Sequence, residues 1–276
     1  MNLKKRPLCF LIIFFLIFLL LQNFLLAENA RHEDKLDKEF LIKFGEDFKK
    51  TLFSPKDWDK KDFLTFSAVL GTGVLFYAFD QEIHDWVQDQ RSSASDDVSG
   101  VVSNFGNGVF LTGLIAALYA SGELSDNNSL RRTALLSLES FVTSGVIVIG
   151  LKFIGGRARP KTGESKDTFH FFSTKSSYNS FPSGHATSAF AVATTIADQS
   201  ENAFVDISAY SLATLAALSR VHDNKHWLSD IFFGSAIGYF VAKKICSLNR
   251  DQNSARLEVS LNFGENSRSF SVILCF

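Results

Sequence analysis

Two histidines in this chain lie beside residues that could use them for proton or phosphoryl transfer. His226 is followed four positions later by Asp230, and on a helix that spacing places both side chains on one face. A carboxylate so placed can accept one imidazole N–H and leave the other ring nitrogen free as a nucleophile or base. His185 follows Ser183 and Gly184 in the run Phe-Pro-Ser-Gly-His, which is typical of a helix N-terminus. Such an end offers free N–H groups to an anion.

Three basic residues near the ends of apolar stretches could hold that anion. Lys152 comes shortly before a glycine pair, and Arg159 directly precedes a proline that disfavours helical geometry for it. Arg220 lies shortly before His226. Lysine supplies a point charge and arginine a planar fork, and together they suit an oxyanion such as phosphate.

Each of these clusters alone has an ordinary explanation. Basic residues at a helix C-terminus interact favourably with the helix dipole, and an i,i+4 pair of opposite charges is usually a weak surface interaction. The ordered pattern K-x6-RP, PSGH and SR-x5-H-x3-D is far more specific than any one of its parts. The combination therefore favours one oxyanion site built from all three clusters.

The elements that must position these residues are apolar helices. Six apolar stretches without internal proline cover 63–79, 107–122, 132–153, 183–198, 204–219 and 228–246. The three clusters lie at the ends of such stretches, where backbone groups are unpaired and available. The sequence therefore predicts an all-α core of six helices over residues 63–248.

The N-terminal end differs from this core. Lys4, Lys5 and Arg6 precede an apolar run, and Ala27 offers a small residue for cleavage. This arrangement predicts a secretory signal peptide over residues 1–27. The alternative is a retained anchor helix, because the run is about long enough to span a bilayer.

Two further segments flank the core. Segment 28–62 has apolar residues at every fourth position, which predicts an amphipathic helix ended by Pro55. These residues are Phe40, Phe44, Phe48 and Leu52. In the tail, 249–276, apolar and polar residues alternate on both sides of a Gly-Glu-Asn-Ser turn, so we expect a short β-hairpin there.

The three clusters together resemble the signature of the type-2 phosphatidic acid phosphatase and vanadium haloperoxidase superfamily. No signature position departs from it, and the resemblance spans roughly residues 63–248. It implies the six-helix bundle of that family. It also implies hydrolysis of phosphate esters without a metal ion or other cofactor, since basic side chains and N–H groups take the place of magnesium.

The resemblance also implies roles for individual residues. His226 would attack phosphorus and form a phospho-histidine, Asp230 would orient it, and His185 would protonate the leaving group. Arg157 and His222 stand beside signature positions and are expected to have supporting roles only. The implied phosphate-binding residues are Lys152, Arg159, Ser183, Gly184 and Arg220.

The expected substrate is a lipid-linked or small phosphate monoester or pyrophosphate. A vanadate-dependent haloperoxidase and a non-catalytic phosphate-binding protein of the envelope are the competing functions. The formal net charge of −1, with charges mixed along the chain, gives no reason to expect a nucleic-acid partner. Which ester is cleaved, and the oligomeric state, are left open by the sequence.

The sequence indicates the cellular location of the protein less directly than its chemistry. The mean hydropathy is only slightly positive, which is low for six spans, and Glu139 lies inside one apolar stretch. The basic pairs at 131–132 and 243–244 would place segment 28–62 in the cytoplasm if the helices span, whereas a cleaved signal would place it outside. We expect an exported, periplasm-facing and membrane-associated domain, with an integral six-span enzyme as the alternative.

Overall fold

The computed structural model describes residues 34–250, 256–264 and 267–275 of the 276-residue chain. The export signal predicted over 1–27 lies outside these residues. Within them, the six predicted apolar stretches are almost entirely helical.

Helix α2 (Lys38–Leu52) lies where the four-residue spacing predicts a helix. It begins after Asp37, whose carboxylate accepts the N–H of Phe40 at 2.9 Å and thereby caps the helix. Its buried Asp47 accepts a hydrogen bond from the side chain of Asn249 at 2.9 Å, which holds α2 against the end of the last helix.

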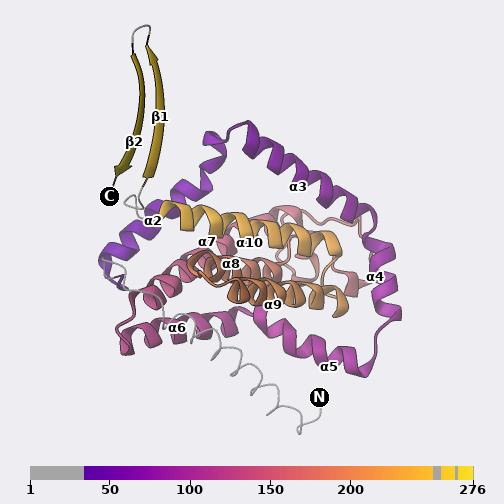
Figure 1. The fold of residues 1–276 in the computed structure, drawn as a ribbon. Coiled ribbons are helices and arrows are strands. Elements are labelled where there is room, and N and C mark those ends of the chain that lie inside the picture. The colour runs from indigo at the N-terminus through magenta and orange to yellow at the C-terminus, as the bar shows by residue number, and fades with distance from the viewer. Residues whose placement is uncertain (1–33, 251–255, 265–266, 276) are drawn as a thin grey trace.

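Each of the six predicted apolar stretches lies in a helix of the structure, and two shorter helices connect the first stretch to the second (Figure 1). In chain order they are α3 (Lys60–Ala78), α4 (Asp80–Asp89), α5 (Ser93–Val102), α6 (Gly108–Leu124), α7 (Asn128–Gly155), α8 (Gly184–Gln199), α9 (Ala203–His222) and α10 (Leu228–Leu248).

Helix α8 lies at the centre of the core, between α7, α9 and α10 (Figure 1). Its alanines and valine are buried with apolar residues of α6, α7 and α9. On the α10 side, a Cβ on Gly234 would lie 2.5 Å from the carbonyl oxygen of Ser183, and one on Gly238 would collide with that of Thr187. Because only glycine allows this approach, the start of α10 lies directly beside the start of α8.

Helices α3, α4 and α5 form an arc around the margin of the core (Figure 1). Much of α3 is apolar yet exposed, with Leu64 72% and Leu75 62% exposed. Among the described residues, α3 packs mainly along α10. The all-helical character of this region is as predicted, but α3 contributes little to the buried part of the core.

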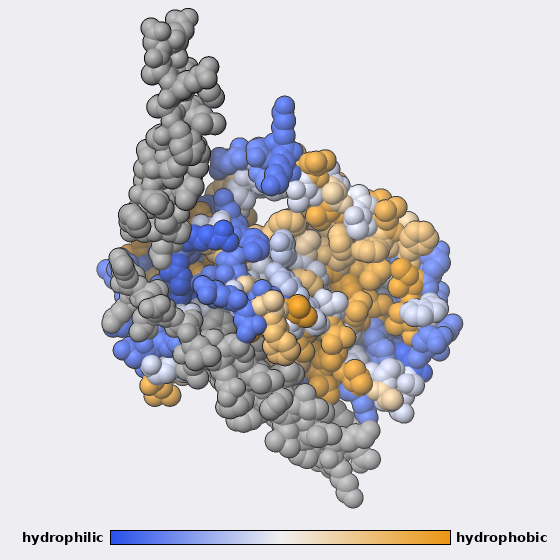
Figure 2. Space-filling model, viewed as in Figure 1, coloured by the Kyte–Doolittle hydropathy of each residue, from blue (hydrophilic) through white to orange (hydrophobic). Residues whose placement is uncertain are grey.

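Three of the described helices, α7, α9 and α10, are long and apolar enough to cross a membrane. Two bent pairs, α3 with α4 and α5 with α6, meet the same criteria when each is taken as one span, so the described residues hold up to five candidates. In Figure 2, apolar residues form a broad band between hydrophilic margins. This surface supports association with a membrane.

The tail contains two strands, β1 (Arg256–Gly264) and β2 (Ser267–Cys275), which pair antiparallel. Val259 lies opposite Val272 in this register. In Figure 1 the two strands extend away from the helices.

Candidate active site

The end of α7 supplies the first cluster. Gly156 ends the helix in the left-handed conformation at φ 60°, and a Cβ there would collide with the carbonyl oxygen of His170. The backbone then becomes extended at Arg159, with ψ 149° before the proline, as the sequence predicts. This change of direction brings the side chains of Lys152 and Arg159 to the same place.

Asn179, which the sequence analysis did not single out, holds both of these cations. Its carbonyl oxygen accepts a hydrogen bond from Lys152 Nζ at 2.6 Å. Its side-chain oxygen accepts one from Arg159 Nη2 at 2.8 Å. The two positive charges are therefore fixed close together before any anion binds.

The start of α8 supplies the second cluster. Ser183 is the N-cap residue, fully buried, and its hydroxyl accepts the N–H of Ala186 at 3.5 Å. Its own N–H donates to the carbonyl oxygen of Asp230 at 2.9 Å, which joins the second cluster to the third. Gly184 and His185 form the first turn and face the cavity described below.

The connection between α9 and α10 supplies the third cluster. The N–H groups of Lys225 and His226 both donate to the carbonyl oxygen of Arg220, at 3.0 and 3.2 Å, and so turn the chain back on itself. Helix α10 begins only at Leu228, so His226 precedes it. The prediction that His226 and Asp230 share one helix face is therefore wrong, although the two side chains do meet.

Asp230 reaches His226 from the first turn of α10. Its Oδ2 accepts the N–H of Trp227 at 3.0 Å and lies 3.7 Å from His226 Nδ1. Ser180 bridges this gap: its hydroxyl donates to Asp230 Oδ2 at 2.5 Å and lies 3.4 Å from His226 Nδ1. The Nδ1 side of the ring thus faces Ser180 and Asp230, which leaves Nε2 as the free nitrogen.

The imidazole of His226 is held neutral. Burial, reinforced by the charges of Lys152 and Arg159, lowers its pKa to about 3, although Asp230 acts in the opposite direction. Only 3% of the residue is exposed. A neutral imidazole with one free nitrogen is the form that can act as a nucleophile.

These side chains surround a cavity of about 410 Å³. Residues of the turn between α5 and α6, such as Asn104 and Asn107, complete its wall. Six of the predicted site residues line it, namely Lys152, Arg159, Gly184, His185, Arg220 and His226. The other two, Ser183 and Asp230, lie buried directly behind this lining, so the structure brings all eight together.

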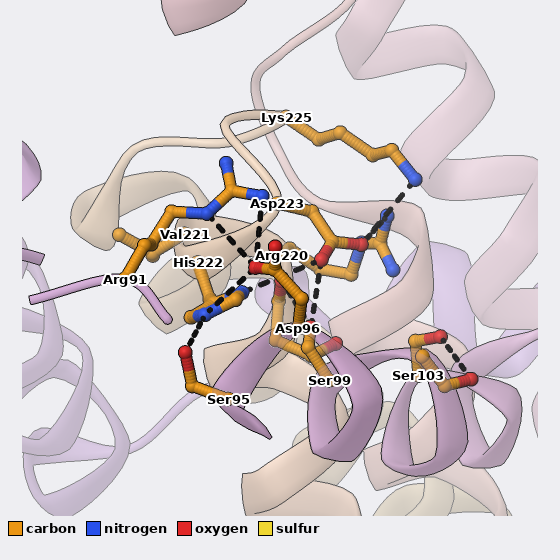
Figure 3. Close-up of polar contacts among 12 residues, drawn as sticks. Arg91, Ser95, Asp96, Ser99, Ser103, Arg220, Val221, His222, Asp223 and Lys225 are labelled. Atoms are coloured by element: carbon orange, nitrogen blue, oxygen red, sulfur yellow. Dashed lines mark hydrogen bonds and ion pairs between the residues drawn. The ribbon is translucent and has the colours of Figure 1, made fainter. Parts of the chain in front are cut away.

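Arg220 is fixed by a carboxylate that the sequence analysis also missed. Asp223 Oδ2 lies 3.1 Å from Arg220 Nη2, and Asp223 Oδ1 accepts the hydroxyl of Ser99 at 2.7 Å (Figure 3). Lys225 approaches the same carboxylate at 3.4 Å. Asp223 thereby connects the buried guanidinium of Arg220 to α5 and leaves the other N–H groups of the guanidinium available to an anion.

His222 does not line the cavity. Its Nε2 lies 3.0 Å from the hydroxyl of Ser95, and Asp96 is nearby at 3.5 Å (Figure 3). It therefore joins α9 to α5.

We expect Asp223→Asn to raise KM about tenfold while changing kcat less than about threefold. The amide loses the ion pair that holds Arg220, so binding of the phosphate weakens before the chemistry does. Steady-state phosphate release at varied substrate concentration measures both constants. Ser99→Ala, which leaves the ion pair intact, serves as the control and should raise KM less than about twofold. A fall in kcat at constant KM in Asp223→Asn would contradict this role.

Known proteins resemble this chain in sequence. A family model described as the PAP2 superfamily matches residues 133–253. A lipid A 1-phosphatase of Rhizobium etli is 26% identical over 200 residues, covering 67% of this chain and 82% of that protein. A lipid A 1-phosphatase of Porphyromonas gingivalis is 37% identical over 67 residues, which are 24% of this chain and only 15% of that protein.

Two solved structures share the fold. The crystal structure of LpxE from Aquifex aeolicus matches with a TM-score of 0.51 and 20% identity, covering 61% of this chain and 95% of that one. A transmembrane PAP2 type phosphatidylglycerolphosphate phosphatase from Bacillus subtilis matches with a TM-score of 0.52 and 21% identity, covering 69% and 98%.

The matched range 133–253 contains all three clusters. The helices that carry them are arranged as in the two solved structures. Over residues 133–253 the chain is therefore similar to the PAP2 superfamily, and it is similar in sequence to two proteins named lipid A 1-phosphatases.

Proposed function

We propose that this protein is a phosphatase that removes phosphate from a membrane lipid through a phospho-histidine at His226. One observation carries the proposal: a neutral imidazole with one free nitrogen faces a cavity whose wall carries four basic side chains. A second histidine, His185, faces the same cavity. This is the arrangement that transfer of a phosphoryl group between an ester and water requires.

In the first step, His226 Nε2 forms a bond to phosphorus while the bond from phosphorus to the ester oxygen breaks. His185 gives its proton to the departing alkoxide. In the second step, His185 takes a proton from water, the resulting hydroxide attacks phosphorus, and the P–N bond breaks to release inorganic phosphate. His226 is then neutral again, and His185 is again protonated.

The basic side chains and the helix N-terminus around the cavity stabilise the negative charge of the phosphoryl group in both steps. Lys152, Arg159 and Arg220 face the non-bridging oxygens, and the N–H of Gly184 at the start of α8 adds a neutral donor. The donors are suited to an oxyanion rather than to a metal cation. We therefore expect EDTA to leave the activity unchanged, and no cofactor to be needed.

A lipid substrate is supported by the surroundings of the cavity. Two of the helices that carry its residues, α7 and α9, are long and apolar enough to cross a membrane, and so is α10, which begins just after His226. A lipid could keep its acyl chains in the membrane while its phosphate enters the cavity. The relative from Rhizobium etli, named a lipid A 1-phosphatase, makes phosphorylated lipid A the first substrate to test.

The test uses the purified full-length protein in detergent micelles. Phosphate release is compared for phosphorylated lipid A, phosphatidylglycerol phosphate, phosphatidate, an isoprenyl pyrophosphate and soluble para-nitrophenyl phosphate, with and without EDTA. We expect at least one lipid to be cleaved far faster than the soluble ester. No phosphate release from any of them would refute the proposed function.

We also propose that residues 1–27 direct export and that the site faces the periplasm. The basic start and apolar run of that segment support this. A tag inserted at residue 30 should then be digested by protease added to intact spheroplasts. Protection of the tag would contradict export of the segment 28–62.

The activity is expected to increase as the pH falls from 7 to 5. Burial and the charges of Arg220, Lys225, Arg159 and Lys152 lower the pKa of His185 to about 4, so at pH 7 only about one free enzyme molecule in a thousand carries the proton it must donate. kcat/KM reports the free enzyme, and the protonated fraction rises to about one in eleven at pH 5, so kcat/KM should rise by up to about 100-fold over this window. kcat should change less because bound phosphate restores the proton.

Lys225→Gln separates this effect from ionisation of the substrate itself. Removing one cation raises the pKa of His185, so the rise in kcat/KM should begin at a higher pH. Lys243→Gln, a lysine paired with Asp198 far from the cavity, should leave the profile unchanged. A pH profile of kcat/KM identical in Lys225→Gln and wild type would contradict the assignment of His185.

A further inference from the structure

Behind Asp230 lies a cluster of buried charges that the mechanism above does not use. Arg157 Nη1 donates to Asp230 Oδ1 at 2.7 Å, and Arg157 Nη2 donates to Asp80 Oδ2 at 2.8 Å. The side chain of Arg157 is 1% exposed and those of the two aspartates 0%. Asp80 begins α4, Arg157 follows α7 and Asp230 lies in α10, so three distant segments meet here.

The remaining polar groups of the cluster are also satisfied. Ser229 donates from its N–H to Asp80 Oδ1 at 2.8 Å and from its hydroxyl to Asp80 Oδ2 at 2.6 Å. Arg157 Nε donates to the carbonyl oxygen of Lys166 at 2.9 Å. The guanidinium also lies 4.7 Å from the ring centre of Tyr77. These contacts leave the guanidinium a single orientation.

That orientation determines how Asp230 meets the nucleophile. Its Oδ1 is taken up by Arg157, so Oδ2 is the oxygen that faces Ser180 and His226. A rotation of the carboxylate would break the hydrogen bond to Arg157. The orientation of Oδ2 toward His226 is therefore fixed by Arg157, a residue that does not line the cavity.

The charges of the cluster also favour the reaction. Two carboxylates surround one guanidinium, so the cluster carries a net negative charge in a buried place, which costs free energy unless a positive group is near. His226 becomes such a group when its Nε2 is phosphorylated and its ring turns cationic. Without Asp80, the charge of Arg157 would be opposed by Asp230 alone, and the attraction for the cationic ring would weaken.

We propose that Asp80 and Arg157 are positioning residues, which fix the carboxylate of Asp230 toward His226 and preserve its negative charge there. The inference rests on the proposed function of His226 and Asp230. A purely structural role, in which the ion pair only anchors the elbow between α3 and α4, makes a different prediction, because it would act independently of Asp230.

A double-mutant cycle distinguishes the two roles. Asp80→Asn keeps an oxygen for Ser229 and removes the charge; we expect kcat to fall roughly 30-fold with KM within about twofold, since loss of alignment acts on the chemical step. In an Asp230→Asn background the same change should alter kcat less than about threefold, because its target is gone. Similar losses in both backgrounds, or a loss below about threefold in the wild type, would overturn the proposal.

Asp198→Asn is the matched control. Asp198 is also a buried carboxylate, 3% exposed and paired with Lys243 at 2.7 Å, but it lies near the far end of α8, about 20 Å from His185. We expect its kcat to stay within about twofold of the wild type. A loss in Asp198→Asn equal to that in Asp80→Asn would mean that any broken buried ion pair has this effect, which would overturn the proposal.

Folding is monitored for every variant by elution volume and thermal unfolding in detergent. If Asp80→Asn does not fold, Arg157→Lys replaces it in the cycle, since lysine keeps the charge but not the fork, and the same criteria apply. The experiment distinguishes failure of this inference from failure of the proposed function. A wild type without phosphatase activity refutes that function and the inference with it, whereas an active wild type with an additive cycle refutes the inference alone.

Discussion

Replacing His226 by alanine is expected to lower kcat at least about 10⁴-fold, the largest effect of any single change in this chain. The imidazole nitrogen Nε2 is the nucleophile that forms the bond to phosphorus. No other described side chain of the cavity wall offers a neutral nitrogen beside a carboxylate. Phosphate release in detergent measures the loss. Binding should persist, because the cations that hold the phosphate remain.

The covalent intermediate gives a second measurement. Wild-type enzyme mixed with ³²P-labelled lipid substrate and quenched in alkali should retain label on the protein, because a phosphoramidate is stable in base and labile in acid. His226→Ala should retain none. Label that persists in His226→Ala would place the nucleophile elsewhere and refute the assignment.

His170→Ala is the matched control for this experiment. His170 is 45% exposed, lies 3.3 Å from Glu164 and does not line the cavity. We expect its kcat within about twofold of the wild type and normal labelling. A comparable loss of labelling in this variant would show that the assay responds to general damage.

The helices and the cavity lining could be predicted from the sequence because both leave a local signal. Apolar runs without proline place α6 to α10 closely, since burial demands a continuous apolar face. The three clusters each combine a helix end with residues suited to an oxyanion. Local patterns of this kind are enough to identify residues that must point the same way.

The residues that hold the lining in place could not be predicted in this way. Asp80, Asn179 and Asp223 are single polar residues at helix ends or in connecting segments, and each acts on a residue far along the chain or across a turn. Nothing in their spacing distinguishes them from ordinary solvent-exposed residues. Their role follows only from the tertiary structure, because burial converts an ordinary ion pair into one with a fixed direction.

The pairing of His226 with Asp230 is a second case in which the sequence pattern does not predict the geometry. The four-residue spacing suggests a shared helix face, yet α10 begins after His226, and Asp230 uses its carboxylate to cap that helix start. A spacing fixes geometry only where the backbone is regular. Here the tight turn at Arg220 brings the two side chains together by another route, with Ser180 between them.

His185→Ala is expected to lower kcat/KM by about 10²- to 10⁴-fold for a lipid phosphate but by less than about tenfold for para-nitrophenyl phosphate. kcat/KM reports formation of the phospho-histidine, whereas the second step, which also uses His185, affects kcat for both substrates. A lipid alkoxide is a poor leaving group that needs a proton, whereas para-nitrophenolate departs without one. Parallel assays of both substrates with the same variant measure the contrast.

The difference between the two substrates distinguishes a general acid from a residue that only binds the phosphate. His185 stands in the first turn of α8, beside the Gly184 N–H that faces the phosphate, so loss of its ring could also disturb the phosphate-binding groups. Such a disturbance would slow both substrates equally, because both present the same phosphate group. His84→Ala, which removes an imidazole bonded to Asn224 outside the cavity, provides the baseline. Equal losses of kcat/KM for the two substrates in His185→Ala would exclude proton donation by His185 and leave it a role in holding the phosphate.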